Sequence, residues 1–153
     1  MKPLRTGTER DIVELFQMLA KGKPAAEDRI PLAAGDTVVT EMAFKFGRAD
    51  IVVFHQDGSA SVIEVKDGTK GYNHVVAGLG QAGLYAVQLA MNKGTLTKVR
   101  KCLLWTSTGN IACDVLIEIM CEHANAIPLP WGLLSAHIRE HQEAVADAMA
   151  ATE

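Results

Sequence analysis

At 153 residues, with 48% hydrophobic residues and a mean hydropathy of +0.10, the chain can form a compact core, which excludes a disordered tail. Its net charge of −3 argues only mildly against a nucleic-acid partner, because carboxylates that bind metal ions also make a protein acidic. No apolar run is long enough to span a membrane, no signal peptide is evident, and the three cysteines lack the spacing of a zinc or iron–sulfur site, so we expect a cytoplasmic protein without a membrane partner.

The hydrophobic pattern predicts a helix, three strands, a second helix and a fourth strand over the first two-thirds of the chain. The expected ranges are 8–20 for the first helix, with Thr8 as its N-cap, 37–46, 49–55 and 59–66 for the strands, about 73–92 for the second helix and 99–106 for the fourth strand. Gly47-Arg48 and Asp57-Gly58 are the expected turns between the three strands.

The pattern is less decisive after residue 110. Residues 112–125 fit a helix or a strand, and their length favours a helix. Two prolines make 126–130 an edge strand or a linker, and 132–150 reads as an alanine-rich helix. We therefore expect a single α/β domain with a mixed central sheet flanked by helices, its core at about 8–106 and a C-terminal helical extension at about 110–150.

Three charged residues stand out because the predicted hairpin brings them together. Glu64 and Lys66 point to the same face of their strand, since side chains alternate along a strand. The Asp57-Gly58 turn folds Asp50 back beside them. Two carboxylates and an ammonium group on one patch of sheet suit a hard divalent cation and a phosphate.

This pattern resembles that of the PD-(D/E)XK nuclease superfamily. The segments 47–53 and 62–66 look like its bipartite motif, with Ala49 where the family name has proline, and the α-β-β-β-α-β order is similar to its restriction-endonuclease-like core. The resemblance implies a nuclease, such as an endonuclease of DNA repair or recombination, that hydrolyses DNA with a metal-activated water as nucleophile. It implies Asp50, Glu64 and Lys66 as catalytic residues, and Asp50, Glu64 and the backbone carbonyl of Val65 as ligands of Mg²⁺ or Mn²⁺.

The resemblance also suggests further site residues. Gln81 and Tyr85 look like the Q-x-x-x-Y signature of the RecB-type and lambda-exonuclease branch, whose helix touches DNA, and Arg48 is a candidate phosphate contact. Glu14, on the first helix, matches a metal-assisting glutamate of Holliday-junction resolvases, and Glu41 competes with it; we prefer Glu14 slightly. The form of the DNA substrate stays open, and a homodimer or higher oligomer is an expectation from the resolvases.

Two other patterns point to different functions. Gly78, Gly80 and Gly83 match the G-x-G-x-x-G of an NAD(P)-binding turn, but no full strand precedes them and basic residues stand where an acid is expected. His137 to His141 matches H-x-x-E-H, but little chain remains for a third zinc ligand. A non-catalytic DNA-binding module is a third alternative.

Overall fold

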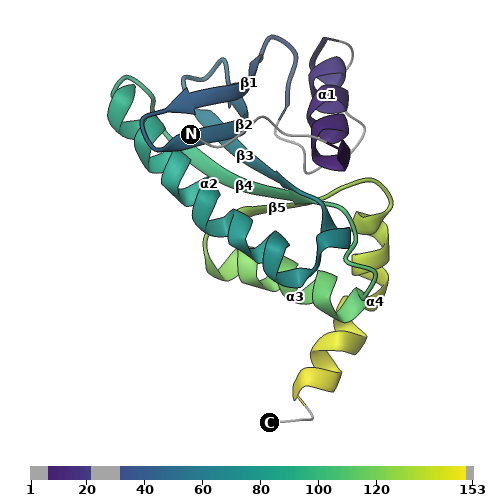
Figure 1. Cartoon of the computed structure of the whole chain (residues 1–153). Coiled ribbons are helices and arrows are strands. Elements are labelled where there is room, and N and C mark those ends of the chain that lie inside the picture. The colour runs from purple at the N-terminus through teal and green to yellow at the C-terminus, as the bar shows by residue number, and fades with distance from the viewer. Residues whose placement is uncertain (1–6, 22–31, 151–153) are drawn as a thin grey trace.

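The structure is a computed structural model that describes residues 7–21 and 32–150 (Figure 1). Its elements follow the predicted order α-β-β-β-α-β and then continue with a helix, a strand and a helix. They are α1 (Gly7–Lys21), β1 (Thr37–Phe44), β2 (Gly47–Phe54), β3 (Ala60–Lys66), the 3₁₀ helix η1 (Gly68–Lys70), α2 (Tyr72–Asn92), β4 (Val99–Trp105), α3 (Ile111–His123), β5 (Ile127–Pro130) and α4 (Leu134–Ala150).

The strands form one mixed sheet in the order β1-β2-β3-β4-β5. The first three are antiparallel neighbours, whereas β3, β4 and β5 run parallel because the helices α2 and α3 carry the chain back between them. The result is an α/β fold with a five-stranded mixed sheet flanked by helices, an arrangement compatible with the restriction-endonuclease-like fold.

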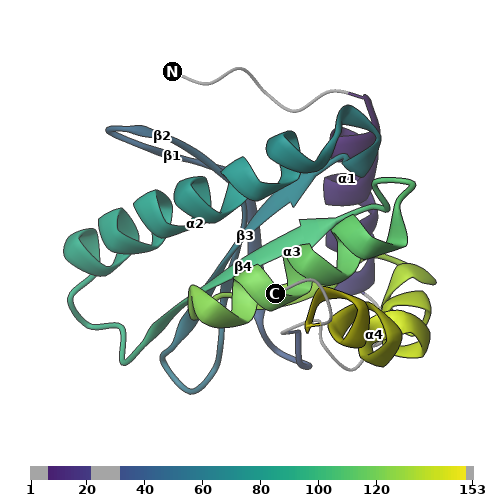
Figure 2. The ribbon, with the colours of Figure 1, turned by 90° about the horizontal axis from the view of Figure 1, so that it is seen from below.

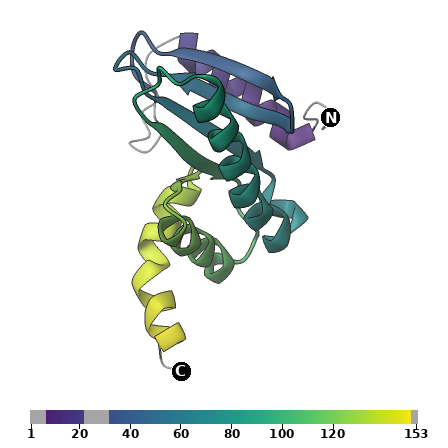
Figure 3. The same cartoon turned by 90° about the vertical axis from the view of Figure 1, so that its left-hand side faces the viewer.

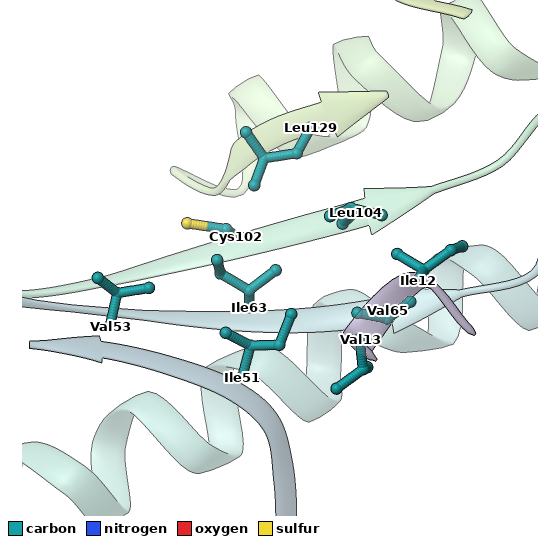
Figure 4. Close-up of a cluster of buried hydrophobic side chains, with 9 residues drawn as sticks. All are labelled: Ile12, Val13, Ile51, Val53, Ile63, Val65, Cys102, Leu104 and Leu129. Carbon is teal, nitrogen blue, oxygen red and sulfur yellow. The ribbon is translucent and has the colours of Figure 1, made fainter. Parts of the chain in front are cut away.

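The two faces of the sheet are covered by different helices. Side chains at odd positions of β2 and β3 pack against Ile12 and Val13 of α1, in the cluster drawn in Figure 4. Val52 of β2 and the even positions of β3 face α2, where Val52 and Val62 pack with Tyr85 and Leu89. Gly47 and Ala49 of β2 also meet Tyr85 on this side. Helix α3 packs beside α2 on the same face of β4, and α4 packs on α3 (Figure 2). Glu64 and Lys66 lie on the face of β3 that α2 covers, and Asp50 stands at the point of β2 where the alternation of faces changes.

Some local predictions need correction. The turn between β1 and β2 is Lys45-Phe46, not Gly47-Arg48, because Phe44 pairs with Gly47, which already belongs to β2. The turn predicted at Asp57-Gly58 lies one residue earlier: the Gly58 N–H donates to the His55 carbonyl around Gln56-Asp57, and the His55 N–H donates to the Ser59 carbonyl. Helix α1 begins at Gly7, so Thr8 is not its N-cap. Strand β5 confirms the edge-strand alternative for 126–130, so the C-terminal extension is not purely helical as expected.

Helix α2 is the longest described helix and contains no Asp, Glu, Lys or Arg. No helix in the described ranges has the length and apolar character needed to cross a membrane.

Candidate active site

The predicted acidic pair lies where strands β2 and β3 diverge. Backbone pairing between them runs from Phe54 and Ala60 to Ile51 and Ile63, and the next position places Asp50 opposite Glu64. At this position side-chain carboxylates, and not backbone carbonyls, accept the hydrogen bonds of two backbone amides. The Asp50 N–H donates to Glu64 Oε1 at 3.3 Å, and the Val65 N–H donates to Asp50 Oδ2 at 2.8 Å. Each acid thus binds a backbone amide of the other strand, which holds the two carboxylates in a fixed relation.

Lys66 lies on the same face, two residues beyond Glu64, and passes beneath α2. Gly78 of α2 makes room for it: a Cβ at Gly78 would lie 3.1 Å from Lys66 Cγ and 2.5 Å from Leu103 Cδ1. The helix therefore lies directly on the lysine stem. Asp50 and Glu64 are 0% exposed and Lys66 is 3% exposed, so all three side chains are buried in this structure.

A fourth charged residue, Glu9 of α1, joins the end of β3. Its Oε1 accepts the N–H of Asp67 at 3.0 Å and lies 2.7 Å from Nε2 of His74 on α2. Glu9 is buried, whereas the His74 side chain is 29% exposed. This contact links α1, the residue that follows Lys66, and α2. The sequence carried a signal for it, because Glu9 shares a helix face with Ile12 and Val13 and so stands on the apolar stripe.

Asp67 completes the turn that follows Lys66. Burial would raise the pKa of its carboxyl, but hydrogen bonds from the side chain and N–H of Thr69 outweigh that effect, and the pKa is lowered. Its carboxylate also accepts the hydroxyl of Thr106, at 3.4 Å, from the loop after β4. Glu9, Asp50, Glu64 and Asp67 are buried acids, and Lys66 is the only buried lysine or arginine in the part of the chain that the structure describes.

The two candidate assisting glutamates occupy different environments. Glu14 is exposed and forms an i,i+4 ion pair with Arg10 at 2.9 Å, so it faces solvent rather than the acidic pair. Glu41 is half-buried and occupies the β1 position opposite Asp50, between the pairs Thr40–Ile51 and Met42–Ala49. Its φ of +54° is unusual for glutamate and interrupts the pairing there. The structure therefore brings Glu41, and not Glu14, to the site.

The expected DNA-contacting residues differ in exposure. Tyr85 is 3% exposed and stacks on Phe44 with ring centroids 5.9 Å apart, so it forms part of the core. Arg48 faces Glu41, with Nε 4.0 Å from Oε2, and is mostly covered. Gln81 is half-buried, and its Oε1 is buried without a hydrogen-bond partner. Of the three, Gln81 has unused hydrogen-bonding capacity beside the site.

The glycine motif does not form a dinucleotide-binding turn. Gly78, Gly80 and Gly83 all lie inside α2, which follows η1 rather than a strand. Their N–H groups belong to the middle of a helix and not to a loop at its N-terminus, so they cannot cradle a pyrophosphate. The NAD(P)-binding interpretation is therefore wrong, and Gly78 serves close packing of the helix on the sheet.

A Ser–His–Asp chain lies at the other end of β3, about 16 Å from Lys66 at roughly 3.3 Å per residue. His55 Nδ1 lies 2.7 Å from Asp36 Oδ2, and His55 Nε2 lies 2.7 Å from Ser61 Oγ. The order of contacts matches a hydrolase triad. Ser61 is fully buried, however, and cannot reach a substrate, so the chain is a structural link between the segment before β1 and the hairpin.

Two surface pockets lie away from the acidic cluster. One pocket, of about 440 Å³, lies beyond the ends of β4 and β5 and is lined in part by Ser107, Asp114, Trp131 and His137. Asp114 is tied down there by Ser107 Oγ and the Thr108 N–H. Within residues 7–21 and 32–150, no group of three or more His, Cys, Asp or Glu side chains is arranged to hold a metal ion by itself.

Comparison with known proteins yields a structural match only. No family model matches the sequence, and no curated protein matches it. Among solved structures, the chain is similar to a chain in the structure of the EndoMS–dsDNA2 complex, with a TM-score of 0.50 and 17% sequence identity. The match covers 85% of this chain and 47% of that chain, so this chain spans about half the length of its structural neighbour. At this identity the likeness concerns the fold.

Proposed function

We propose that this chain is a divalent-metal-dependent DNA nuclease of the PD-(D/E)XK superfamily. The observation that carries the proposal is the opposed pair Asp50 and Glu64 at the divergence of β2 and β3, with Lys66 on the same face. The similarity of fold to a chain of a complex with double-stranded DNA supports DNA as the substrate.

The residues at the end of β3 fit a hard divalent cation. Their acids outnumber the single buried lysine, and a buried excess of negative charge is costly unless a cation offsets it. Two carboxylates and a backbone carbonyl suit Mg²⁺, which binds oxygen ligands and keeps several of its waters. Asp50, Glu64 and the carbonyl of Val65 would hold the ion. When bound, it neutralises charge on the phosphate and lowers the pKa of a water molecule.

The chain's own residues would orient the reacting groups. The reciprocal bonds to backbone amides fix Asp50 and Glu64 before the substrate arrives, so little reorganisation is needed during reaction. Lys66 would donate a hydrogen bond to a phosphate oxygen or to the attacking water, as a point charge that favours the transition state. Solvent reaches this cluster at His74, so we propose that the phosphate approaches from the side of His74 and η1.

We assign the assisting carboxylate to Glu9 in place of Glu14. Glu9 is buried and bonded to the N–H of the residue after Lys66, whereas Glu14 faces solvent in its pair with Arg10. Glu41 stays the competing candidate because it stands opposite Asp50 with a strained backbone. Replacing each glutamate by glutamine in turn distinguishes them, with Glu14→Gln as the matched control on the same helix.

The decisive experiment is a DNA cleavage assay with and without Mg²⁺ or Mn²⁺ on wild type, Asp50→Asn, Glu64→Gln and Lys66→Met. We expect the acid variants to lose cleavage and to bind Mn²⁺ more weakly by calorimetry. We expect Lys66→Met to lose cleavage while keeping most of its Mn²⁺ affinity. Glu14→Gln should cut like wild type. Cleavage by Glu64→Gln at the wild-type rate would overturn the assignment.

The burial of all three signature side chains favours a second candidate, a DNA-binding module without catalysis. In that case Asp50, Glu64 and Lys66 act as a buried polar network that shapes the strand divergence. A gel-shift assay beside the cleavage assay separates the two: binding of DNA without cleavage under Mg²⁺ or Mn²⁺ supports the module.

The substrate form is best resolved with a panel of labelled DNAs. Gln81 and Tyr85 suggested end-processing enzymes, and the first-helix glutamate suggested junction resolvases. Because Tyr85 is part of the core and Glu9 lies at the site, we propose that the chain cuts internally, at a junction or other distorted duplex. The rate of cleavage should then differ among linear duplex, single strand, flap and four-way junction, and circular DNA should also be cut. Strict dependence on a free end would contradict internal cutting.

A further inference from the structure

Helix α2 has two opposite apolar faces, and the helices and strands that the structure describes cover only one of them. Its buried side chains are Val75, Gly78, Ala82, Tyr85 and Leu89. Its exposed positions include Asn73, Ala77, Gly80, Leu84, Val87 and Met91. Both sets repeat with alternating steps of three and four residues, the spacing of a seam that packs along another element. We name the exposed set the outer seam of α2.

The outer seam carries most of the large apolar surface of the described chain. Leu84, Val87 and Met91 are 46%, 58% and 79% exposed. Phe46, 61% exposed, joins them from the β1–β2 turn, which Gln88 fastens to α2 by bonding both the N–H and the carbonyl of Phe46 at 3.0 Å. In Figures 1 and 3 the described helices and strands leave this side of the C-terminal half of α2 open. An exposed apolar patch of this kind marks an interaction surface.

The size of the side chains along the seam points to the partner. The N-terminal half is small, with Ala77 and Gly80, and the C-terminal half is large, with Val87 and Met91. A second copy of α2 laid antiparallel about a two-fold axis at Leu84 would place Met91 over Ala77 and Val87 within one residue of the level of Gly80. Large residues then fill the spaces left by small ones in both halves, as a two-fold interface requires. A Cβ at Gly80 would meet nothing within 4 Å, so that space is open.

We propose that the chain forms a homodimer through antiparallel packing of the outer seams of two α2 helices. The absence of charge on α2 favours this partner, because a self-pairing helix brings like charges together unless it has none. The same absence argues against nucleic acid on this face, since phosphate contacts need cations. Lys45, beside Phe46, supplies a charged residue for the polar rim of the interface. The dimer does not depend on the proposed nuclease activity.

The seam is modest in area, so the dimer should dissociate on dilution. A helix of 21 residues offers a strip of about 30 Å by 10 Å. This is smaller than the roughly 800 Å² per partner of a typical stable interface, so we expect a weak dimer that forms only at high protein concentration.

Sedimentation equilibrium over a concentration series up to several hundred micromolar tests the dimer. Wild type should pass from monomer to dimer. Leu84→Glu should stay monomeric, because the two-fold axis brings the new charges together. Leu133→Glu is the matched control: Leu133 is 90% exposed and lies outside the seam, so this variant should dimerise like wild type. Circular dichroism checks that all three are folded. A wild type that stays monomeric throughout the series would overturn the proposal.

Oxidative cross-linking tests the orientation of the pair. In the antiparallel register, residue 84 meets its own copy whereas residue 73 does not. Leu84→Cys should therefore form a disulfide-linked dimer, and Asn73→Cys should form none above the wild-type background. The wild-type cysteines Cys102 and Cys121 are buried, and Cys113 sets that background. Equal cross-linking of the two variants would show a parallel or unspecific contact and would reject the antiparallel dimer.

Discussion

Gln81 is the residue whose environment most needs a reason. Its amide oxygen is buried without a hydrogen-bond partner, and it stands one turn of α2 beyond Gly78, which lies over Lys66. Leaving a buried polar atom unpaired costs about 1–3 kcal/mol. Such a cost is tolerated where a substrate or an ion supplies the missing partner.

We therefore predict that Gln81→Ala lowers DNA cleavage at least tenfold while leaving stability unchanged or raising it slightly. Urea unfolding measures the stability, and initial cleavage rates measure the activity. Tyr85→Ala is the contrast, because Tyr85 packs in the core and truncating a buried aromatic residue costs about 3–5 kcal/mol. A Gln81→Ala protein that is markedly less stable than wild type would show that the amide is structural.

At the scale of elements, the glycines of α2 have different roles although they belong to one motif. Alanine at Gly78 would clash with Leu103 and press on Lys66, so we predict that Gly78→Ala destabilises the fold by about 1–3 kcal/mol. Alanine at Gly83 meets nothing within 4 Å and should stabilise the helix by up to about 1 kcal/mol. Thermal melts of the two variants check this pair. Equal effects would mean that α2 does not lie on Lys66 as described.

The contact between the segment before β1 and the β2–β3 hairpin predicts that the stability of the fold depends on pH. Burial would raise the pKa of Asp36, but hydrogen bonds from the Ala33 N–H and from His55 outweigh it, so the pKa is lowered. A carboxyl with a lowered pKa stabilises the fold above its unfolded pKa, about 3.9, and loses that contribution as pH falls through the folded value.

We accordingly predict that Asp36→Asn is less stable than wild type at pH 7 and that the difference narrows steadily below about pH 4. Urea unfolding of both proteins across this range measures it. Asp57→Asn is a useful comparison, since Asp57 also has a lowered pKa, from its bonds to Ser59, but is exposed in the turn. A difference in the free energy of unfolding between wild type and Asp36→Asn that stays constant with pH would contradict the role given to the carboxylate.

At the scale of the whole molecule, two cysteines report on the opening of the core. Burial raises the pKa of Cys102 and of Cys121 to about 12, so both remain protonated and covered at neutral pH. We predict that iodoacetamide modifies only Cys113 in the folded protein and reaches the other two after denaturation. Mass spectrometry after timed alkylation measures this. Rapid modification of Cys102 under native conditions would mean that the sheet opens far more readily than its burial implies.

Most of the fold was predictable from the sequence because its signals are local. Alternating and continuous apolar runs marked the four long strands, and Asp57-Gly58 marked the β2–β3 turn to within one residue. The turn before Gly47 was misplaced by two residues, since a glycine with φ of +102° can follow a turn as well as form it. Strand β5 was ambiguous because its two prolines permit only an edge position, and whether an edge strand forms depends on its neighbour β4.

Strand periodicity and turn chemistry depend only on nearby residues, so the sequence was enough to predict that Asp50 lies opposite Glu64 and that Glu64 and Lys66 share a face of β3. What surrounds these residues depends on how distant elements pack. This packing buried the three side chains, brought Glu9 and His74 to the end of β3 and turned Glu14 to solvent. It also enclosed Tyr85 and left Leu84, Val87 and Met91 exposed on α2. The physical reason is that burial depends on which helix face packs on the sheet, and an apolar pattern on both faces of α2 leaves that choice to packing.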